Sequence, residues 1–160
     1  MNTKLKIENC DKIYVQKFAE KIGKCLKSGD SIFLYGPVGV GKTFFVNCLV
    51  RGVLSLKGVD DLVTSPTFNL VNIYNQNKDP IWHVDLYRLE HPTDINELGL
   101  EQAFFEAICL VEWPDILDNA IVERAIRLSI HNSKSESNLR DLELVIPKRN
   151  FNNECFYIEI

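Results

Sequence analysis

The chain has 160 residues, a hydrophobic content of 46% and a formal net charge of −4, which is enough apolar material for one packed domain. Because the net charge is negative, no overall positive field attracts nucleic acid or an anionic membrane. The sequence shows no amino-terminal leader and no apolar run of about 18 residues. We therefore expect no membrane partner, a cytoplasmic location and a single domain over residues 1–160.

Five cysteines, at positions 10, 25, 48, 109 and 155, include no C-x-x-C pair. Their odd number and wide spacing predict neither a disulfide framework nor a zinc site. We interpret them as small buried apolar residues in a reducing compartment.

The first third of the sequence predicts a helix, a strand and a second helix. Apolar residues recur at helical spacing over residues 11–27, and Gly29 follows as a stop signal. Residues 30–35 are mostly apolar and predict a short strand. Residues 42–53 predict a helix with an apolar inner side.

The middle of the chain predicts a β-hairpin followed by short helices. Residues 68–74 and 81–89 have strand character, and the turn-forming residues 75–80 separate them. Residues 95–98 and 100–105, divided by a glycine, predict two short helical segments.

The last third predicts further strands. Residues 107–113 form an apolar run of strand length, typical of a strand that is covered on both faces, and residues 115–122 suggest a helix. Residues 125–130 and 142–146 alternate apolar and polar side chains and predict a second hairpin, while residues 156–160 fit an edge strand or a loose end. Together these elements predict an α/β domain with a mixed, partly antiparallel central sheet.

Residues 36–43 read GPVGVGKT and match G-x-x-x-x-G-K-[ST], the phosphate-binding loop of nucleoside triphosphatases. Such a loop surrounds phosphate oxygens with backbone N–H donors, so we expect Lys42 to reach the β- and γ-phosphates and Thr43 to ligate Mg²⁺. An ordinary glycine-rich turn is the alternative, but the position between a strand and a helix favours a P-loop NTPase-like domain of three layers. The residues expected to bind ATP here are Gly36, Pro37, Val38, Gly39, Val40, Gly41, Lys42 and Thr43.

Two acidic residues end apolar strands and could complete a Mg²⁺ site. Asp85 closes the strand that begins at Ile81, and in extended geometry it shares a face with His83. We expect Asp85 to hold Mg²⁺ or its water, with a plain surface carboxylate as the alternative. Glu112 ends the run 107–111, and we expect it to bind the metal or to orient or deprotonate the attacking water. A solvated glutamate paired with a basic residue fits its chemistry as well.

Other side chains could complete the site. Thr67, in the sequence S-P-T, occupies the place of a loop whose hydroxyl senses the γ-phosphate, or else an ordinary turn. Trp113 could stack on the nucleotide or pack in the core. We expect His83 to be a hydrogen-bonded core residue, and Arg88 and Arg124 to form surface ion pairs.

Several short motifs occur in one order along the chain: the phosphate loop at 36–43, SPTF at 65–68, HVDLYRL at 83–89, ELGL at 97–100 and VEW at 111–113. In order and approximate spacing they resemble the bacterial TsaE (YjeE) ATPases, over residues 11–130. The combination is far more specific than the phosphate loop alone.

The resemblance implies a small Mg²⁺-dependent ATPase required for threonylcarbamoyladenosine modification of tRNA. It also implies two protein partners, TsaD and TsaB, whose complex is reset by ATP hydrolysis, and tRNA contact only through that complex. By the same resemblance Lys42 and Thr43 are the phosphate and Mg²⁺ ligands. Asp85 is then the metal-strand aspartate, Glu112 the acidic residue needed for turnover, and Thr67 the switch-loop hydroxyl.

Two other functions stay open on the sequence. A small-molecule kinase shares the loop, but such enzymes commonly close an arginine-bearing lid, and arginines are scarce between residues 66 and 125. A nucleotide-sensing module that never hydrolyses is the second alternative, and the two carboxylates argue against it. The family's loop usually reads GDLGAGKT. Here Pro37, Val38 and Val40 occupy variable positions, so nucleotide binding should be retained.

Overall fold

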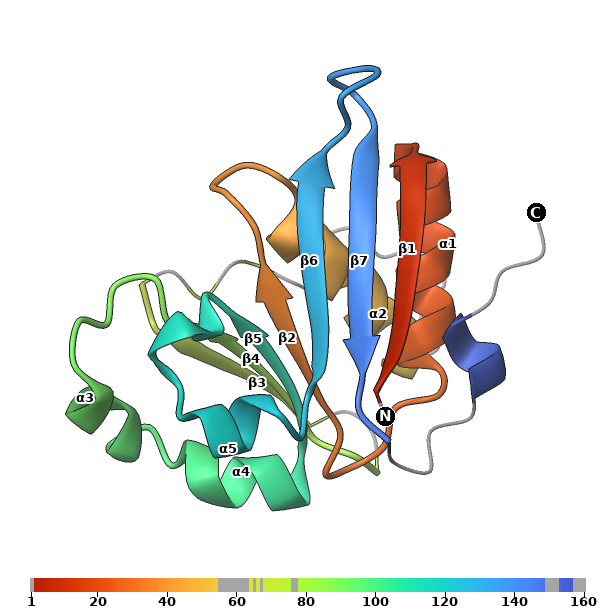
Figure 1. The fold of residues 1–160 in the computed structure, drawn as a ribbon. Helices are drawn as coiled ribbons and strands as arrows, with labels where there is room; N and C mark the ends of the chain where they lie inside the picture. The colour runs from red at the N-terminus through yellow and green to blue at the C-terminus, as the bar shows by residue number, and fades with distance from the viewer. Residues whose placement is uncertain are drawn as a thin grey trace.

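The computed structural model describes residues 2–54, 64, 66, 68–75, 78–148 and 153–156. Within these residues a seven-stranded sheet lies between two layers of helices (Figure 1), and no helix is long and apolar enough to cross a bilayer. The strands are β1 Thr3–Cys10, β2 Ser31–Tyr35, β3 Val71–Tyr74, β4 Ile81–Asp85, β5 Ile108–Glu112, β6 Ile126–Asn132 and β7 Arg140–Ile146. The helices are α1 Lys12–Gly23, α2 Lys42–Leu54, α3 Pro92–Asn96, α4 Leu100–Glu106 and α5 Asn119–Val122, with 3₁₀ turns η1 Pro114–Ile116 and η2 Asn153–Phe156.

The sheet has the order β1-β7-β6-β2-β5-β4-β3. Its centre is parallel, because β2 pairs in parallel with β5 and β6, and β4 pairs in parallel with β5. Its margins are antiparallel, with β3 against β4, β6 against β7, and β1 against β7. The predicted mixed sheet and both hairpins are therefore confirmed. The carboxyl ends of β2, β4 and β5 meet at one edge, where α/β sheets place ligands.

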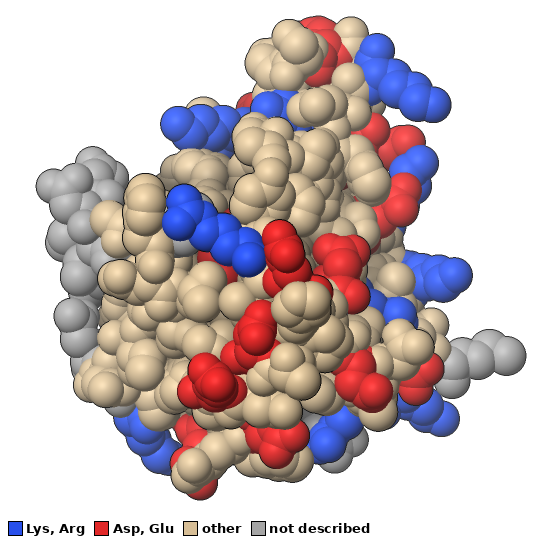
Figure 2. Space-filling model, turned by 90° about the vertical axis from the view of Figure 1, so that its left-hand side faces the viewer, with Lys and Arg blue, Asp and Glu red and all other residues tan. Residues whose placement is uncertain are grey.

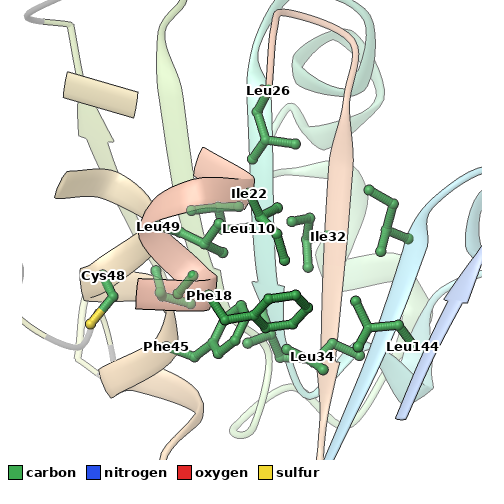
Figure 3. Close-up of a cluster of buried hydrophobic side chains, with 14 of the residues drawn as sticks. Phe18, Ile22, Leu26, Ile32, Leu34, Phe45, Cys48, Leu49, Leu110 and Leu144 are labelled. Carbon is green, nitrogen blue, oxygen red and sulfur yellow. The ribbon is translucent and has the colours of Figure 1, made fainter. Parts of the chain in front are cut away.

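Alternate residues of β2 point to opposite faces of the sheet and belong to two hydrophobic cores. Ile32 and Leu34 pack against α1 and α2, where the rings of Phe18 and Phe45 meet edge to face with centroids 6.4 Å apart (Figure 3). Phe33 points the other way, into the core that α3, α4 and α5 cover. Every residue of β5 is buried, so the prediction of a strand covered on both faces is confirmed.

Two glycines let α1 and α2 cross at close range. A Cβ atom at Gly23 would lie 2.2 Å from the carbonyl oxygen of Leu49, and one at Gly52 would lie 2.2 Å from that of Glu20. Any larger side chain would push the helices apart. The close crossing holds α2, and with it the phosphate loop at its amino end, against the sheet.

Three predicted elements extend less far than the sequence pattern suggested. β3 begins at Val71 and not at residue 68, because Leu70 has a positive φ of 61° that interrupts the extended chain. α1 ends at Gly23 and not at residue 27, because the N–H groups of Cys25 and Leu26 donate to carbonyls three residues back and turn the chain. β4 ends at Asp85 and not at residue 89, because the carboxylate of Asp85 accepts a hydrogen bond of 3.0 Å from the N–H of Tyr87.

One strand was not predicted from the sequence. β1, at the start of the chain, pairs with β7 and takes the edge of the sheet that residues 156–160 could have occupied. Phe156 instead ends the turn η2, with its side chain buried against α1 and its neighbours in the core. The rest of that segment lies outside the described residues.

The prediction that the chain has no disulfide is wrong for one pair. Cys25 and Cys155 are bonded, with Cα atoms 6.3 Å apart and 130 positions between them in sequence. So wide a separation leaves no spacing signal, since only the folded chain brings η2 to the end of α1. The remaining cysteines, Cys10, Cys48 and Cys109, are free and buried, as predicted.

Candidate active site

The loop between β2 and α2 has a backbone conformation that requires glycine. Gly36, Gly39 and Gly41 have φ values of 138°, 77° and 115°, which other residues rarely adopt. A Cβ atom at Gly36 would also lie 2.4 Å from the carbonyl oxygen of Ile130, whereas one at Gly39 would meet nothing within 4 Å. Gly39 and Gly41 line the pocket described below, and a loop of this kind can surround phosphate oxygens with N–H donors.

Lys42, the first residue of α2, folds back over this loop. Its ammonium donates hydrogen bonds to the carbonyl oxygens of Gly36 at 2.6 Å and Pro37 at 2.9 Å, and lies 3.9 Å from the centroid of the Trp113 ring. Burial lowers the pKa of Lys42 below its ordinary value, although nearby carboxylates oppose that shift. A buried ammonium held by neutral carbonyls is well suited to bind an anion.

Glu112 is the centre of a buried hydrogen-bonded group. The hydroxyl of Thr43 donates to both carboxylate oxygens, at 2.9 Å to Oε1 and 3.1 Å to Oε2. Nε2 of His83 lies 2.8 Å from Oε1, and the side chains of His83 and Glu112 are 0% and 3% exposed. The prediction for His83 is confirmed. A solvated Glu112 is not what the structure shows, because the carboxylate is buried against Thr43 and His83.

Asp85 lies beside Glu112, because the two residues are paired across β4 and β5. Its side chain is 5% exposed, and Oδ1 accepts the hydrogen bond from Tyr87 that ends the strand. Asp85 is therefore not a plain surface carboxylate. The parallel register brings both acids to the same edge of the sheet, next to the phosphate loop.

A pocket of about 330 Å³ opens at this edge. The ring of Trp113 forms part of its wall and lies 4.8 Å from the ring of Tyr87, centroid to centroid. Trp113 is therefore not a core residue, and its backbone has a positive φ of 58°. The residues that line the pocket are Val38, Gly39, Gly41, Lys42, Thr43, Phe44, Asp85, Tyr87, Glu112 and Trp113.

Some predicted residues stay outside this lining. Gly36 and Pro37 contribute the carbonyl oxygens that hold Lys42, and the side chain of Val40 is buried in the core beside α1 and α2. Thr67 lies outside the described residues, so its role stays a prediction.

The donor set fits a Mg²⁺ ion that is bound together with phosphate. The hydroxyl of Thr43 and the carboxylates of Asp85 and Glu112 are hard oxygen donors in one pocket. Where the structure describes the chain, no three or more His, Cys, Asp or Glu side chains are arranged to hold a metal alone. Mg²⁺ commonly takes one or two carboxylates and completes its coordination with waters and phosphate oxygens.

Arg140 shapes the site without belonging to any motif. Its Nε donates to the carbonyl oxygen of Val40 at 2.8 Å, and NH1 donates to the carbonyls of Ser137 and Leu139. Arg140 therefore braces the phosphate loop from β7. No local pattern could reveal this contact, because 100 positions separate the two residues. The sequence does contain a signal for Tyr87, because this residue lies two positions after Asp85 in the motif HVDLYRL.

The ion pairs predicted for two other arginines are not present among the described residues. The guanidinium of Arg88 lies 4.7 Å from the ring centroid of Phe68, and that of Arg124 lies 5.2 Å from that of Phe105. Both aromatic rings are largely exposed, so each arginine covers apolar surface with its planar cation.

A family model described as "Threonylcarbamoyl adenosine biosynthesis protein TsaE" matches residues 11–141. The chain belongs to the TsaE family. The match includes the phosphate loop and both pocket carboxylates, so the resemblance inferred from the motifs is confirmed.

Relatives named tRNA threonylcarbamoyladenosine biosynthesis protein TsaE are similar over much of the chain. The protein of Rickettsia prowazekii is 33% identical over 130 residues, which is 81% of this chain and 83% of its own length. That of Rickettsia felis is 35% identical over 115 residues, 72% of this chain and 66% of its own. That of Bacillus subtilis is 33% identical over 105 residues, which is 65% of this chain and 63% of its own length. The chain thus spans slightly less than two thirds of the last two.

A solved structure shares the fold of this TsaE family member. The crystal structure of YdiB from Bacillus subtilis superposes with a TM-score of 0.74 and covers 97% of this chain and 93% of its own. The identity is 22%, so the likeness concerns the fold.

Proposed function

We propose that this chain is a Mg²⁺-dependent ATP hydrolase that acts in threonylcarbamoyladenosine modification of tRNA. It works with the TsaB–TsaD complex and resets that complex by hydrolysing ATP. Membership of the TsaE family supports the pathway. The observation that carries the hydrolase is the convergence of Lys42, Thr43, Asp85 and Glu112 in one pocket behind a phosphate loop.

Each of these side chains has a distinct role in the proposed reaction. Lys42 binds the β- and γ-phosphates with the donors that it gives to the loop carbonyls in this structure. Thr43 and Asp85 would hold Mg²⁺, which when bound neutralises charge on the phosphates. Glu112 is the carboxylate that orients the attacking water for in-line displacement.

The positions of the arginines support slow ATP hydrolysis in the absence of partners. No arginine is among the described residues that line the pocket; Arg140 donates to backbone carbonyls, and Arg88 and Arg124 cover aromatic rings. An arginine that neutralises transition-state charge commonly raises hydrolysis by about 10³-fold or more. The same observation disfavours the lid of a small-molecule kinase.

Contact with tRNA through the complex, and not by this chain directly, is supported by charge. Residues 89–126 carry many acidic side chains, and Arg124 is the single lysine or arginine among them. Figure 2 shows Asp and Glu gathered over the face that α3, α4 and α5 form. A polyanion is repelled by such a surface.

Reconstitution tests this proposal directly. The chain is combined with TsaB, TsaD, tRNA, threonylcarbamoyl-adenylate and ATP, and repeated modification and phosphate release are measured. We expect native chain and the exposed-lysine control Lys17→Ala to support multiple turnover, and Lys42→Ala to stop after a single cycle. Equal repeated modification by Lys42→Ala would overturn the reset role. Transfer of phosphate to a metabolite in place of water would identify a kinase.

A further inference from the structure

His83 and Glu112 form a contact that the sequence motifs do not explain. Nε2 of His83 lies 2.8 Å from Oε1 of Glu112, and both side chains are buried. Because an ionised carboxylate only accepts hydrogen bonds, the ring donates through a hydrogen on Nε2. We propose that His83 is a positioning residue that fixes the Glu112 carboxylate for water activation, an inference that rests on the proposed ATP hydrolysis.

The sheet builds this contact into the backbone. His83 on β4 is paired with Leu110 on β5, and Glu112 lies two residues further along β5 on the same face. Diagonal neighbours across a strand pair are within reach of long side chains. The His83 ring therefore reaches the Glu112 carboxylate across one face of the sheet, and the contact does not require any loop to become ordered.

Apart from its contact with Glu112, the imidazole of His83 is poorly suited to this buried position. Nδ1 of His83 is buried and has no hydrogen-bond partner among the described residues. Its strand neighbour on the same face, Ile81, and its cross-strand partner Leu110 are both apolar and 0% exposed. An apolar side chain would fill this position without an unsatisfied nitrogen. Broken local rules of this kind concentrate at functional sites, and the contact to Glu112 is the compensating gain.

The two donors define which carboxylate oxygen is available. Oε1 of Glu112 accepts from both His83 and Thr43, whereas among the described residues Oε2 accepts only the longer bond from Thr43, at 3.1 Å. Rotation of the carboxylate would break both bonds to Oε1. His83 therefore presents Oε2 as the oxygen that receives a hydrogen bond from water.

Paired substitutions separate this role from packing. His83→Leu introduces an apolar side chain of similar size and removes the donor, whereas His83→Gln keeps an N–H donor at a similar distance from the backbone. We expect His83→Leu to lower kcat for ATP by about 10-fold to 100-fold, the usual effect of losing a partner that orients a ligand or catalytic group, with KM and the Kd for a non-hydrolysable ATP analogue unchanged. His83→Gln should recover most of kcat.

The control is Ile81→Val, which trims the same buried face without touching Glu112. It should lower thermal stability slightly and leave kcat unchanged. The inference is overturned if His83→Leu hydrolyses ATP like the native chain, if His83→Gln is as impaired as His83→Leu, or if kcat falls equally in Ile81→Val. Absence of any Lys42-dependent hydrolysis by the native chain, even with TsaB and TsaD, would instead overturn the proposed function on which the inference rests.

A spectroscopic measurement tests the contact without turnover. In ¹⁵N spectra of the labelled ring, the hydrogen of His83 should reside on Nε2 in the native chain, and its signal should change when Glu112 is replaced by alanine. A ring with no hydrogen on Nε2 would contradict the proposal, whatever the kinetics show.

Discussion

The ammonium of Lys42 lies 3.9 Å from the centroid of the Trp113 ring, which covers it from the pocket side of the loop. Trp113 adopts a positive φ of 58°, a strained conformation for a bulky residue, directly after Glu112. The pocket thus contains an aromatic side chain whose surroundings depend on what Lys42 binds.

We expect ATP binding to change the fluorescence of Trp113. Phosphate oxygens would take over the donors of Lys42, and the charge next to the ring would then be compensated. The measurement is a titration of tryptophan emission with ATP and Mg²⁺. Trp82, the other tryptophan, is partly buried against the core that α3, α4 and α5 cover. Trp82→Phe should therefore keep the response, and Trp113→Phe should lose it. A response that survives in Trp113→Phe would contradict the assignment.

Two glycines of the loop should differ in their tolerance of alanine. Both have positive φ, but a Cβ at Gly36 meets the carbonyl oxygen of Ile130 at 2.4 Å, and a Cβ at Gly39 meets nothing within 4 Å. We expect Gly36→Ala to lower the free energy of unfolding by about 3 kcal/mol and Gly39→Ala by about 1 kcal/mol, the latter from backbone strain alone. Denaturant titration measures both, and equal losses would show that the contact with Ile130 is not the cause.

The site was predictable to the extent that its residues lie in local patterns. A strand, a glycine loop and a helix in sequence fix the position of Lys42 and Thr43, and strand-end acids identify Asp85 and Glu112. The contact between His83 and Glu112 was not predictable, because it depends on the register between β4 and β5. Sequence alone places a histidine in a strand without saying which side chain its ring reaches.

The fold was predictable in its elements and less so in its edges. Hairpins and buried strands follow from apolar periodicity, which acts over a few residues. The edge strand β1 alternates only weakly between exposed and half-buried side chains, so its pattern does not stand out. The bond between Cys25 and Cys155 joins segments 130 positions apart, and no composition rule pairs them.

Loss of the disulfide should lower stability without affecting the nucleotide site. Cys155 is buried against α1, and Figure 1 shows η2 and the loop after β2 on different sides of the molecule. We expect Cys25→Ser to lower the free energy of unfolding by about 2 to 4 kcal/mol, as for other disulfides that close long loops, with ATP affinity unchanged. Denaturant titration with and without reductant checks this.

Reductant serves as the matched control for that prediction. It should destabilise the native chain to the level of Cys25→Ser and have no further effect on the variant. If the native chain is equally stable with and without reductant, the bond contributes nothing to the free energy of unfolding.

Cys109 gives the stability of the chain a dependence on alkaline pH. Its thiol is 0% exposed in the middle of β5, and burial raises its pKa from 9.0 to about 12. In the unfolded chain the thiol ionises near the ordinary value. Between pH 9.0 and about 12 the folded state therefore holds a proton that the unfolded state has released. The contribution of the buried thiol to the free energy of unfolding is thus fully present below pH 9.0 and is lost as pH rises toward about 12.

The prediction is that the stability difference between the native residue and Cys109→Ala closes and then reverses as pH rises, with both chains in a Cys25→Ser, Cys155→Ser background that prevents disulfide exchange. At neutral pH the alanine variant should be less stable by about 1 kcal/mol, because it leaves a small cavity. Each pH unit above 9.0 should shift that difference by about 1.4 kcal/mol toward the alanine variant, which then becomes the more stable chain, since only the thiol favours the unfolded state as it ionises. Tyrosine and lysine titrations affect both chains alike and cancel. A stability difference that stays constant across this range, measured by guanidinium titration, would show that Cys109 does not keep its proton on folding.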